Sequence, residues 1–151
     1  MENILVKKMI EDGLTISTAE SCTGGMLSSC IIDVPGASNI ISEAHVTYSN
    51  EAKVKYLNVS MDTLDTYSEY SEECAREMAK GVKNLAETDI GVSITGVAGP
   101  GGGTPNNPVG TVYIGISYKD TDVLKLQLKG NRSSVRKQAV EKTIEFIIDK
   151  I

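Results

Sequence analysis

A strand pattern that passes directly into a helix pattern is the feature that most restricts the fold of this chain. Residues Leu14 to Thr18 have the pattern of a β-strand, and the pair Gly24-Gly25 separates them from the apolar helical run Met26 to Ile32. Pro35-Gly36 predicts the end of that helix. Strand-turn-helix units of this kind occur where helices pack on the faces of a sheet.

The rest of the chain continues to alternate between helix and strand patterns. Further strands are predicted at Ala44–Ser49, Ile90–Ile94, Val109–Ser117 and Val123–Lys129. Helices are predicted over residues 1–12, before Gly13, and after the N-cap residues Asn50, Ser71 and Ser133. The last two strands flank the turn-like segment Lys119–Asp122, so we expect an antiparallel hairpin.

These elements fit one domain that covers residues 1–151. Alternating helices and strands with one hairpin favour a three-layer α/β/α sandwich with a mixed sheet. In such folds ligands usually bind beyond the carboxyl ends of the strands. Three polar segments of this chain follow predicted strands, and they are the candidate sites.

Charge and cysteine content restrict the partners of the protein. A net charge of −5 argues against a nucleic acid partner, which needs a broad basic surface. The three cysteines form no Cys-x-x-Cys pair, so we expect a reducing compartment and neither a disulfide nor a zinc site. No apolar run approaches the roughly 20 residues that cross a bilayer, and the first residues lack a signal-peptide pattern. We therefore expect a cytoplasmic protein with no membrane segment.

The first polar segment, Glu20–Gly25, lies where a strand gives way to a helix. The hydroxyl of Ser21 could attack a carbonyl there, while the amides of Cys22 to Gly24 receive the developing negative charge. A Cys22 thiolate is an alternative nucleophile, because a helix N-terminus can lower a thiol pKa. An ordinary turn in which Thr23 caps the helix also explains these residues, and their spacing alone favours it.

The second segment, Thr47–Lys53, offers a base. His45 is the one imidazole of the chain, but a histidine beside a strand is more often packed or exposed than catalytic. Lys53 is predicted in the first turn of a helix, where the helix terminus and partial burial would both lower its pKa. An exposed lysine near acidic groups such as Glu51 is the other interpretation.

The third segment is the Gly-rich stretch Thr95–Gly103, whose amides can approach an anion or a flat ring closely. It lacks the Gly-Lys-Ser/Thr ending of a P-loop, so ATP binding is not expected, and a flexible surface loop is its other interpretation. Near the last helix, Arg132 and Arg136 could hold a phosphate together with the helix N-terminus. Arginines on an exposed helix are, however, usually solvated.

Taken together, these stretches resemble the CinA C-terminal domain family, the nicotinamide mononucleotide deamidases. The resemblance runs from about Leu14 to the final helix. It is carried by Thr18–Gly25, Val46–Lys53, Ser93–Pro100 with Gly102-Gly103, Pro108–Val112 and Gly130–Arg136.

The resemblance implies an α/β/α homodimer that hydrolyses the carboxamide of nicotinamide mononucleotide, releasing ammonia and nicotinate mononucleotide without a metal or cofactor. It implies a Ser21–Lys53 dyad that forms an acyl-enzyme, with Tyr48 and Thr95 in the same catalytic group. An arginine should face the substrate phosphate. Arg132 is preferred to Arg136 because it is expected in a loop.

Further residues are expected to bind the substrate. They are Glu20, Cys22, Thr23, Gly24, Gly25, Asn50, Gly96, Gly99, Arg132 and Arg136. The resemblance begins near the start of the chain, so the separate N-terminal domain of longer family members is not expected. A non-catalytic module that binds a nucleotide or another phosphate ligand is the alternative from a different functional class.

Overall fold

The structure is a computed structural model that describes residues 1–151. Its helices are α1 (Glu2–Asp12), α2 (Met26–Ile32), α3 (Asn50–Leu57), α4 (Met61–Tyr67), α5 (Glu72–Ala86) and α6 (Arg132–Lys150), with a short 3-10 helix η1 (Ala37–Asn39) after α2. Its strands are β1 (Ile16–Glu20), β2 (Ile41–Val46), β3 (Ile90–Gly96), β4 (Thr111–Ser117) and β5 (Thr121–Gln127).

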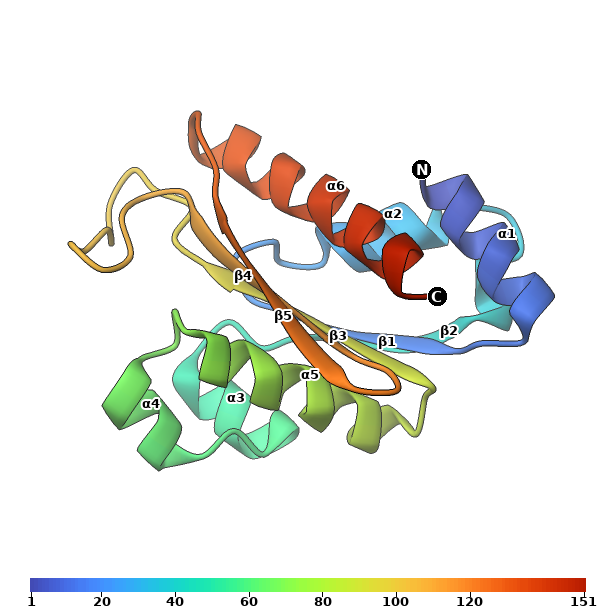
Figure 1. The fold of residues 1–151 in the computed structure, drawn as a ribbon, viewed down its shortest axis with the longest axis horizontal. Helices are drawn as coiled ribbons and strands as arrows, with labels where there is room; N and C mark the ends of the chain where they lie inside the picture. The colour runs from blue at the N-terminus through green and yellow to red at the C-terminus, as the bar shows by residue number, and fades with distance from the viewer.

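The five strands form one mixed sheet in the order β2-β1-β3-β4-β5. Strand β1 pairs in parallel with both β2 and β3, whereas β3 with β4 and β4 with β5 are antiparallel pairs. Figure 1 shows α1, α2 and α6 on one face of the sheet and α3, α4 and α5 on the other. The predicted three-layer sandwich with a mixed sheet is therefore confirmed.

The two faces of the sheet are packed differently. The larger aliphatic core lies under α1, α2 and α6. On the other face α5 approaches so closely that a Cβ on Gly91 would lie 2.2 Å from the Ala79 carbonyl oxygen, and one on Gly115 would lie 2.4 Å from that of Ala75. Ser93 Oγ also donates a hydrogen bond to the Ala75 carbonyl at 2.6 Å. Small residues therefore set the distance between α5 and the sheet.

Several element boundaries differ from the predictions. Strand β1 begins at Ile16, because Gly13 ends α1 with a φ of 64° and pairing with β2 and β3 starts only at Ile16. The strand predicted at Ala44–Ser49 lies at Ile41–Val46, an edge strand whose mostly exposed side chains give a weak pattern. Helix α4 was not predicted, because its short and largely polar sequence has little apolar periodicity.

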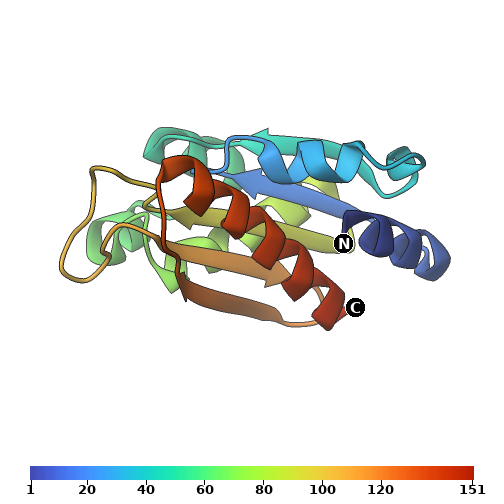
Figure 2. The same ribbon diagram turned by 90° about the horizontal axis from the view of Figure 1, so that it is seen from above.

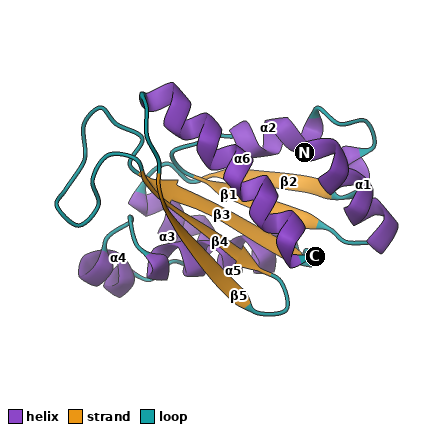
Figure 3. Cartoon of the chain, turned by 45° about the horizontal axis from the view of Figure 1, so that its top comes forward, coloured by secondary structure: helices purple, strands orange, loops and turns teal.

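The polar segments lie together at one end of the sheet, where the parallel strands terminate. The carboxyl ends of β1, β2 and β3 point to this end because these strands run in parallel. Figure 2 shows that α6 also starts there, next to the long segment 97–110. Figure 3 shows that this Gly-rich segment is an extended loop, as its composition predicted.

Candidate active site

A cavity of about 370 Å³ opens at this end of the sheet, between the turn after β1, the start of α3 and the loop after β3. All three predicted polar segments contribute to its wall. The predicted site residues that line it are Ser21, Cys22, Tyr48, Asn50, Lys53, Gly96, Gly99 and Arg132.

Ser21 and Lys53 meet in the wall of this cavity. The Nζ atom of Lys53 lies 3.3 Å from Ser21 Oγ and donates a hydrogen bond to the Thr47 carbonyl oxygen at 3.0 Å. The Lys53 side chain is only 1 % exposed and has no carboxylate partner among the ion pairs of the chain. An amine and a hydroxyl thus share a polar contact in a place nearly closed to water.

Burial of Lys53 changes its protonation. Loss of water around the amine lowers the pKa of Lys53, while the nearby Cys74 and Glu69 act in the opposite direction. Helix α3 positions the lysine as its fourth residue, and its N-cap is Ser49, whose Oγ accepts a hydrogen bond from the Ala52 amide. The prediction that Asn50 caps this helix is therefore wrong by one residue.

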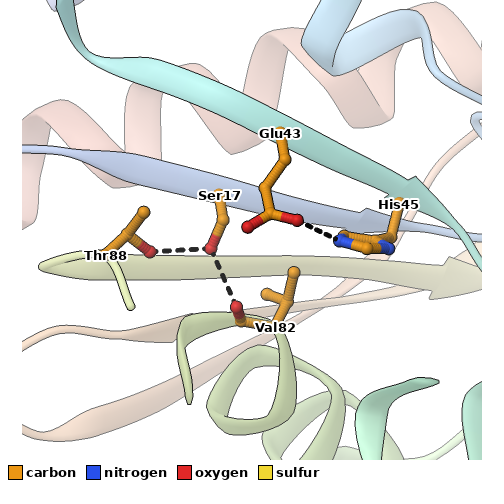
Figure 4. Close-up of polar contacts among 5 residues, drawn as sticks. All are labelled: Ser17, Glu43, His45, Val82 and Thr88. Atoms are coloured by element: carbon orange, nitrogen blue, oxygen red, sulfur yellow. Dashed lines mark hydrogen bonds and ion pairs between the residues drawn. The ribbon is translucent and has the colours of Figure 1, made fainter. Parts of the chain in front are cut away.

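His45 lies away from this pair. Its Nε2 atom is 3.0 Å from Glu43 Oε2, on the same exposed edge strand, and Figure 4 shows the two side chains turned toward each other. Figure 4 also shows that the hydroxyl of Ser17, on β1, is hydrogen-bonded to Thr88 and to the Val82 carbonyl. His45 makes no hydrogen bond to Ser21, so the arrangement contains no Ser-His-Asp triad.

The Glu20 carboxylate, which was expected to bind the substrate, lies instead at the start of α2. Successive strand residues point to opposite faces, so the side chain before Ser21 is buried beneath α2. Its carboxylate accepts hydrogen bonds from the amides of Gly25, Leu27 and Ser28 at 2.9–3.1 Å and from the Thr23 hydroxyl at 2.6 Å. The carboxylate caps α2, whereas the proposed Thr23 cap is wrong.

Four residues of the turn that were expected to bind the substrate are not at the cavity. Glu20, Thr23, Gly24 and Gly25 do not line the cavity. The Ser21 amide donates to the Ile94 carbonyl and the Gly24 amide to the Ser21 carbonyl, so neither is free for an oxyanion. The amide of Cys22 donates no hydrogen bond within the chain, and Cys22 itself lines the cavity.

The Cys22 thiol is poorly suited to act as the nucleophile. Burial raises the pKa of Cys22 to about 11, although the Arg136 charge acts in the opposite direction. Near neutral pH the group is therefore a protonated thiol, and the reactive thiolate is scarce.

The two arginines of the last helix have separate places. Arg132 lines the cavity and donates hydrogen bonds to the Gly99 carbonyl at 2.8 Å and to the Tyr48 hydroxyl at 3.2 Å. It is the first residue of α6 and not a loop residue, because the N-cap is Asn131 and not the predicted Ser133.

Arg136 lies behind the turn and not in the cavity. Its Nε donates to the Cys22 carbonyl at 2.9 Å and its Nη2 to the Thr23 carbonyl at 3.1 Å. The expected contact between Arg136 and the substrate is therefore corrected: this side chain fixes the turn that carries Ser21.

Thr95 also needs correction. Its side chain is fully buried on the α5 side of β3, donates a hydrogen bond to the Glu69 carbonyl at 2.8 Å and does not line the cavity. Tyr48 does line the cavity, but its hydroxyl contacts Arg132 and neither Ser21 nor Lys53.

Two cavity residues lie outside all of the predicted segments. Glu69 and Tyr70 lie in the connection between α4 and α5 and line the cavity opposite the predicted segments. No motif marks them, because a tertiary contact from β3 brings this connection to the site. The one sequence feature that could have pointed to this connection is Glu69, an acidic residue two positions before Ser71, the N-cap of α5.

No cluster of three or more His, Cys, Asp or Glu side chains is arranged to hold a metal ion. None of the helices is long and apolar enough to cross a membrane.

Comparison with known proteins places the chain in a family. The family model of the CinA C-terminal domain matches residues 1–151. A competence-damage inducible protein of Clostridium perfringens is 49 % identical over 148 residues, covering 97 % of this chain and 36 % of that protein. A CinA-like protein of Kosmotoga olearia is 51 % identical over the same length and with the same coverage. This chain thus spans about a third of the length of these curated relatives.

Solved structures agree with the sequence comparison. A CinA superfamily protein of Escherichia coli superposes with a TM-score of 0.96 at 33 % identity, covering 99 % of this chain and 88 % of that one. The competence/damage inducible protein CihA of Agrobacterium tumefaciens gives a TM-score of 0.89 at 34 % identity, covering 98 % and 94 %. The chain belongs to the CinA C-terminal domain family.

Proposed function

We propose that this protein hydrolyses the carboxamide of nicotinamide mononucleotide to nicotinate mononucleotide and ammonia, with Ser21 as nucleophile and Lys53 as base. The observation that carries the proposal is the contact of 3.3 Å between the buried Lys53 amine and Ser21 Oγ in the cavity wall. An amine whose pKa is lowered by burial can take a proton from a hydroxyl near neutral pH more readily than an exposed lysine.

The reaction proceeds in two halves. The neutral Lys53 amine accepts the Ser21 proton as Oγ bonds to the amide carbon, and the resulting ammonium protonates the departing nitrogen, which leaves as ammonia. Water then attacks the Ser21 ester, giving one proton to Lys53, and the carbon–Oγ bond breaks to release the carboxylic acid, which ionises to the carboxylate by losing its proton to water. Lys53 returns that proton to Ser21, so both residues are regenerated.

Backbone and arginine groups complete the site. The free amide of Cys22 is placed to receive the oxyanion, because it follows the nucleophile directly. Arg132 binds the phosphate in this proposal, which is supported by its position in the cavity wall without a carboxylate partner. The cavity volume of about 370 Å³ lies within the roughly 300–1,000 Å³ of small-ligand pockets.

A coupled assay for ammonia tests the proposal. Purified protein should release ammonia from nicotinamide mononucleotide and release much less from nicotinamide, which lacks the ribose phosphate, or from the dinucleotide, whose phosphate is joined to the adenylate phosphate in an anhydride. Saturable calorimetric binding of nicotinamide mononucleotide without ammonia release would instead support the non-catalytic binding module.

Arg136 provides a prediction about the turn. Replacement of Arg136 by methionine should lower kcat by roughly ten- to a hundredfold with a much smaller change in KM, because the side chain orients the peptides that carry Ser21 and the Cys22 amide without touching the cavity. Steady-state kinetics measure the two constants separately.

Lys137→Met is the matched control, since it removes an exposed cation from the same helix. It should leave both constants within about twofold of the parent. A loss at Arg136 that appears in KM alone would contradict the positioning role.

A further inference from the structure

Two acidic residues line the cavity without an ion-pair partner, Glu51 and Glu69, and Glu69 is the less exposed of the two. Glu69 lines the cavity with Ser21 and Lys53, and its side chain is half-buried. The carboxylate takes part in no ion pair of the chain, and the contact from Thr95 goes to its backbone carbonyl. A partly buried carboxylate without a partner, on a residue that lines a cavity, suits a cationic ligand.

The backbone that carries Glu69 is held in place. Thr95 binds its carbonyl at 2.8 Å, Ser71 Oγ donates to the Ser68 carbonyl at 2.8 Å, and the Tyr70 amide donates to Ser68 Oγ at 3.1 Å. Ser68 has a φ of 70°, which residues other than glycine rarely adopt. Such strained positions gather at functional sites, where the surrounding structure maintains them.

An unpaired cation lies in the same cavity. The Arg132 guanidinium donates only to a carbonyl and a phenol hydroxyl and has no carboxylate partner. Glu69 and Arg132 come from opposite sides of the sheet, and they do not pair with each other. A ligand that carries both a positive ring and a phosphate would satisfy both charges, whereas a purely anionic ligand would be repelled by Glu69.

We infer that Glu69 selects the oxidised, positively charged pyridinium ring of the substrate over its neutral dihydropyridine form. The inference rests on the proposed function and deepens it. Glu69 lines the same cavity as Ser21 and Lys53, so a ring whose carboxamide reaches Ser21 lies in the cavity that Glu69 borders. The carboxamide is attached to the same six-membered ring that contains the charged nitrogen. When the carboxamide reaches Ser21, the ring charge therefore lies in the same cavity as the Glu69 carboxylate, which attracts it.

Binding to a Ser21→Ala variant separates recognition from chemistry. Calorimetry would give the Kd of oxidised nicotinamide mononucleotide and of its 1,4-dihydro form, which has the same ribose phosphate and carboxamide but a neutral ring. Adding Glu69→Gln should weaken binding of the oxidised form by roughly tenfold, because a charge pair is lost, and change binding of the dihydro form by less than about twofold. The retained dihydro affinity also shows that the cavity is intact.

Asp65→Asn is the matched control, because it removes an exposed carboxylate of α4 outside the cavity. It should leave both Kd values within about twofold. Equal weakening of both nucleotides by Glu69→Gln, or no weakening of either, would overturn the inference. Absence of ammonia release by the unchanged chain would overturn the proposed function instead. In that case, a Glu69→Gln effect on the Kd of the charged ring alone would still show that Glu69 selects the ring charge.

Discussion

Replacing Ser21 by alanine should reduce ammonia release from nicotinamide mononucleotide by on the order of 10⁴-fold or more. The reason is that Ser21 Oγ forms the acyl bond and is the only hydroxyl in hydrogen-bond contact with the Lys53 amine. The change from a hydroxymethyl to a methyl group in a buried turn should leave the fold unchanged. A sensitive ammonia assay over long incubation times measures the residual rate.

Cys22→Ala is the natural comparison, since the two residues are adjacent and both line the cavity. With the Cys22 pKa raised to about 11, its thiol does not replace the serine, and turnover should stay within about tenfold of the parent. Full activity of the Ser21 variant, or an equal loss in the Cys22 variant, would remove Ser21 as the nucleophile.

Replacing Lys53 by methionine should reduce the rate by on the order of 10³-fold, because methionine fills a similar volume but cannot accept the Ser21 proton. The parent kcat/KM should rise with pH as Lys53 loses its proton, starting below the usual lysine range because burial lowers its pKa. The residual activity of the variant should lack this rise. A pH–rate profile for both proteins tests the base directly, and an unchanged profile in the variant would assign the titration to another group.

The same substitution has a signature in stability. Burial lowers the folded-state pKa of Lys53 below its unfolded value of about 10.4, so the unfolded chain binds more protons between these two pKa values. The free energy of unfolding of the parent should therefore rise with pH through this interval, whereas the Lys53→Met variant lacks that contribution. Denaturant titrations between about pH 7 and pH 10 should show that the free energy of unfolding of the parent increases relative to that of the Lys53→Met variant as the pH increases. A constant difference would mean that Lys53 is not perturbed.

Part of the site could be predicted because its residues lie in local patterns. Ser21 follows a strand and precedes a glycine pair, Lys53 lies near a helix start, and the segment after β3 is rich in glycine. Each pattern predicted a position at the carboxyl end of a strand, and the structure brings all three to one cavity.

Other assignments failed for physical reasons that can be identified. Glu20 and Ser21 are neighbours, but strand alternation sends one carboxylate beneath α2 and the hydroxyl to the opposite face. Thr95 faces the same side of the sheet as Ser21, but its hydroxyl is buried against the connection before α5, where it donates a hydrogen bond to the carbonyl of Glu69. The period of two could have corrected the assignment of Glu20, whereas only the tertiary contact with Glu69 decided that of Thr95.

The sequence by itself determined the alternation of helices and strands, the mixed sandwich, and the places where strands end in polar turns, because these depend on patterns within about ten residues. Tertiary structure alone decided the environment of each charge. Lys53 is deprived of water by packing, Arg136 reaches back from the last helix to the first turn, and Glu69 enters the cavity through a contact with β3. Desolvation and contacts between distant segments arise only when the chain is folded, and these set the chemistry available to Ser21.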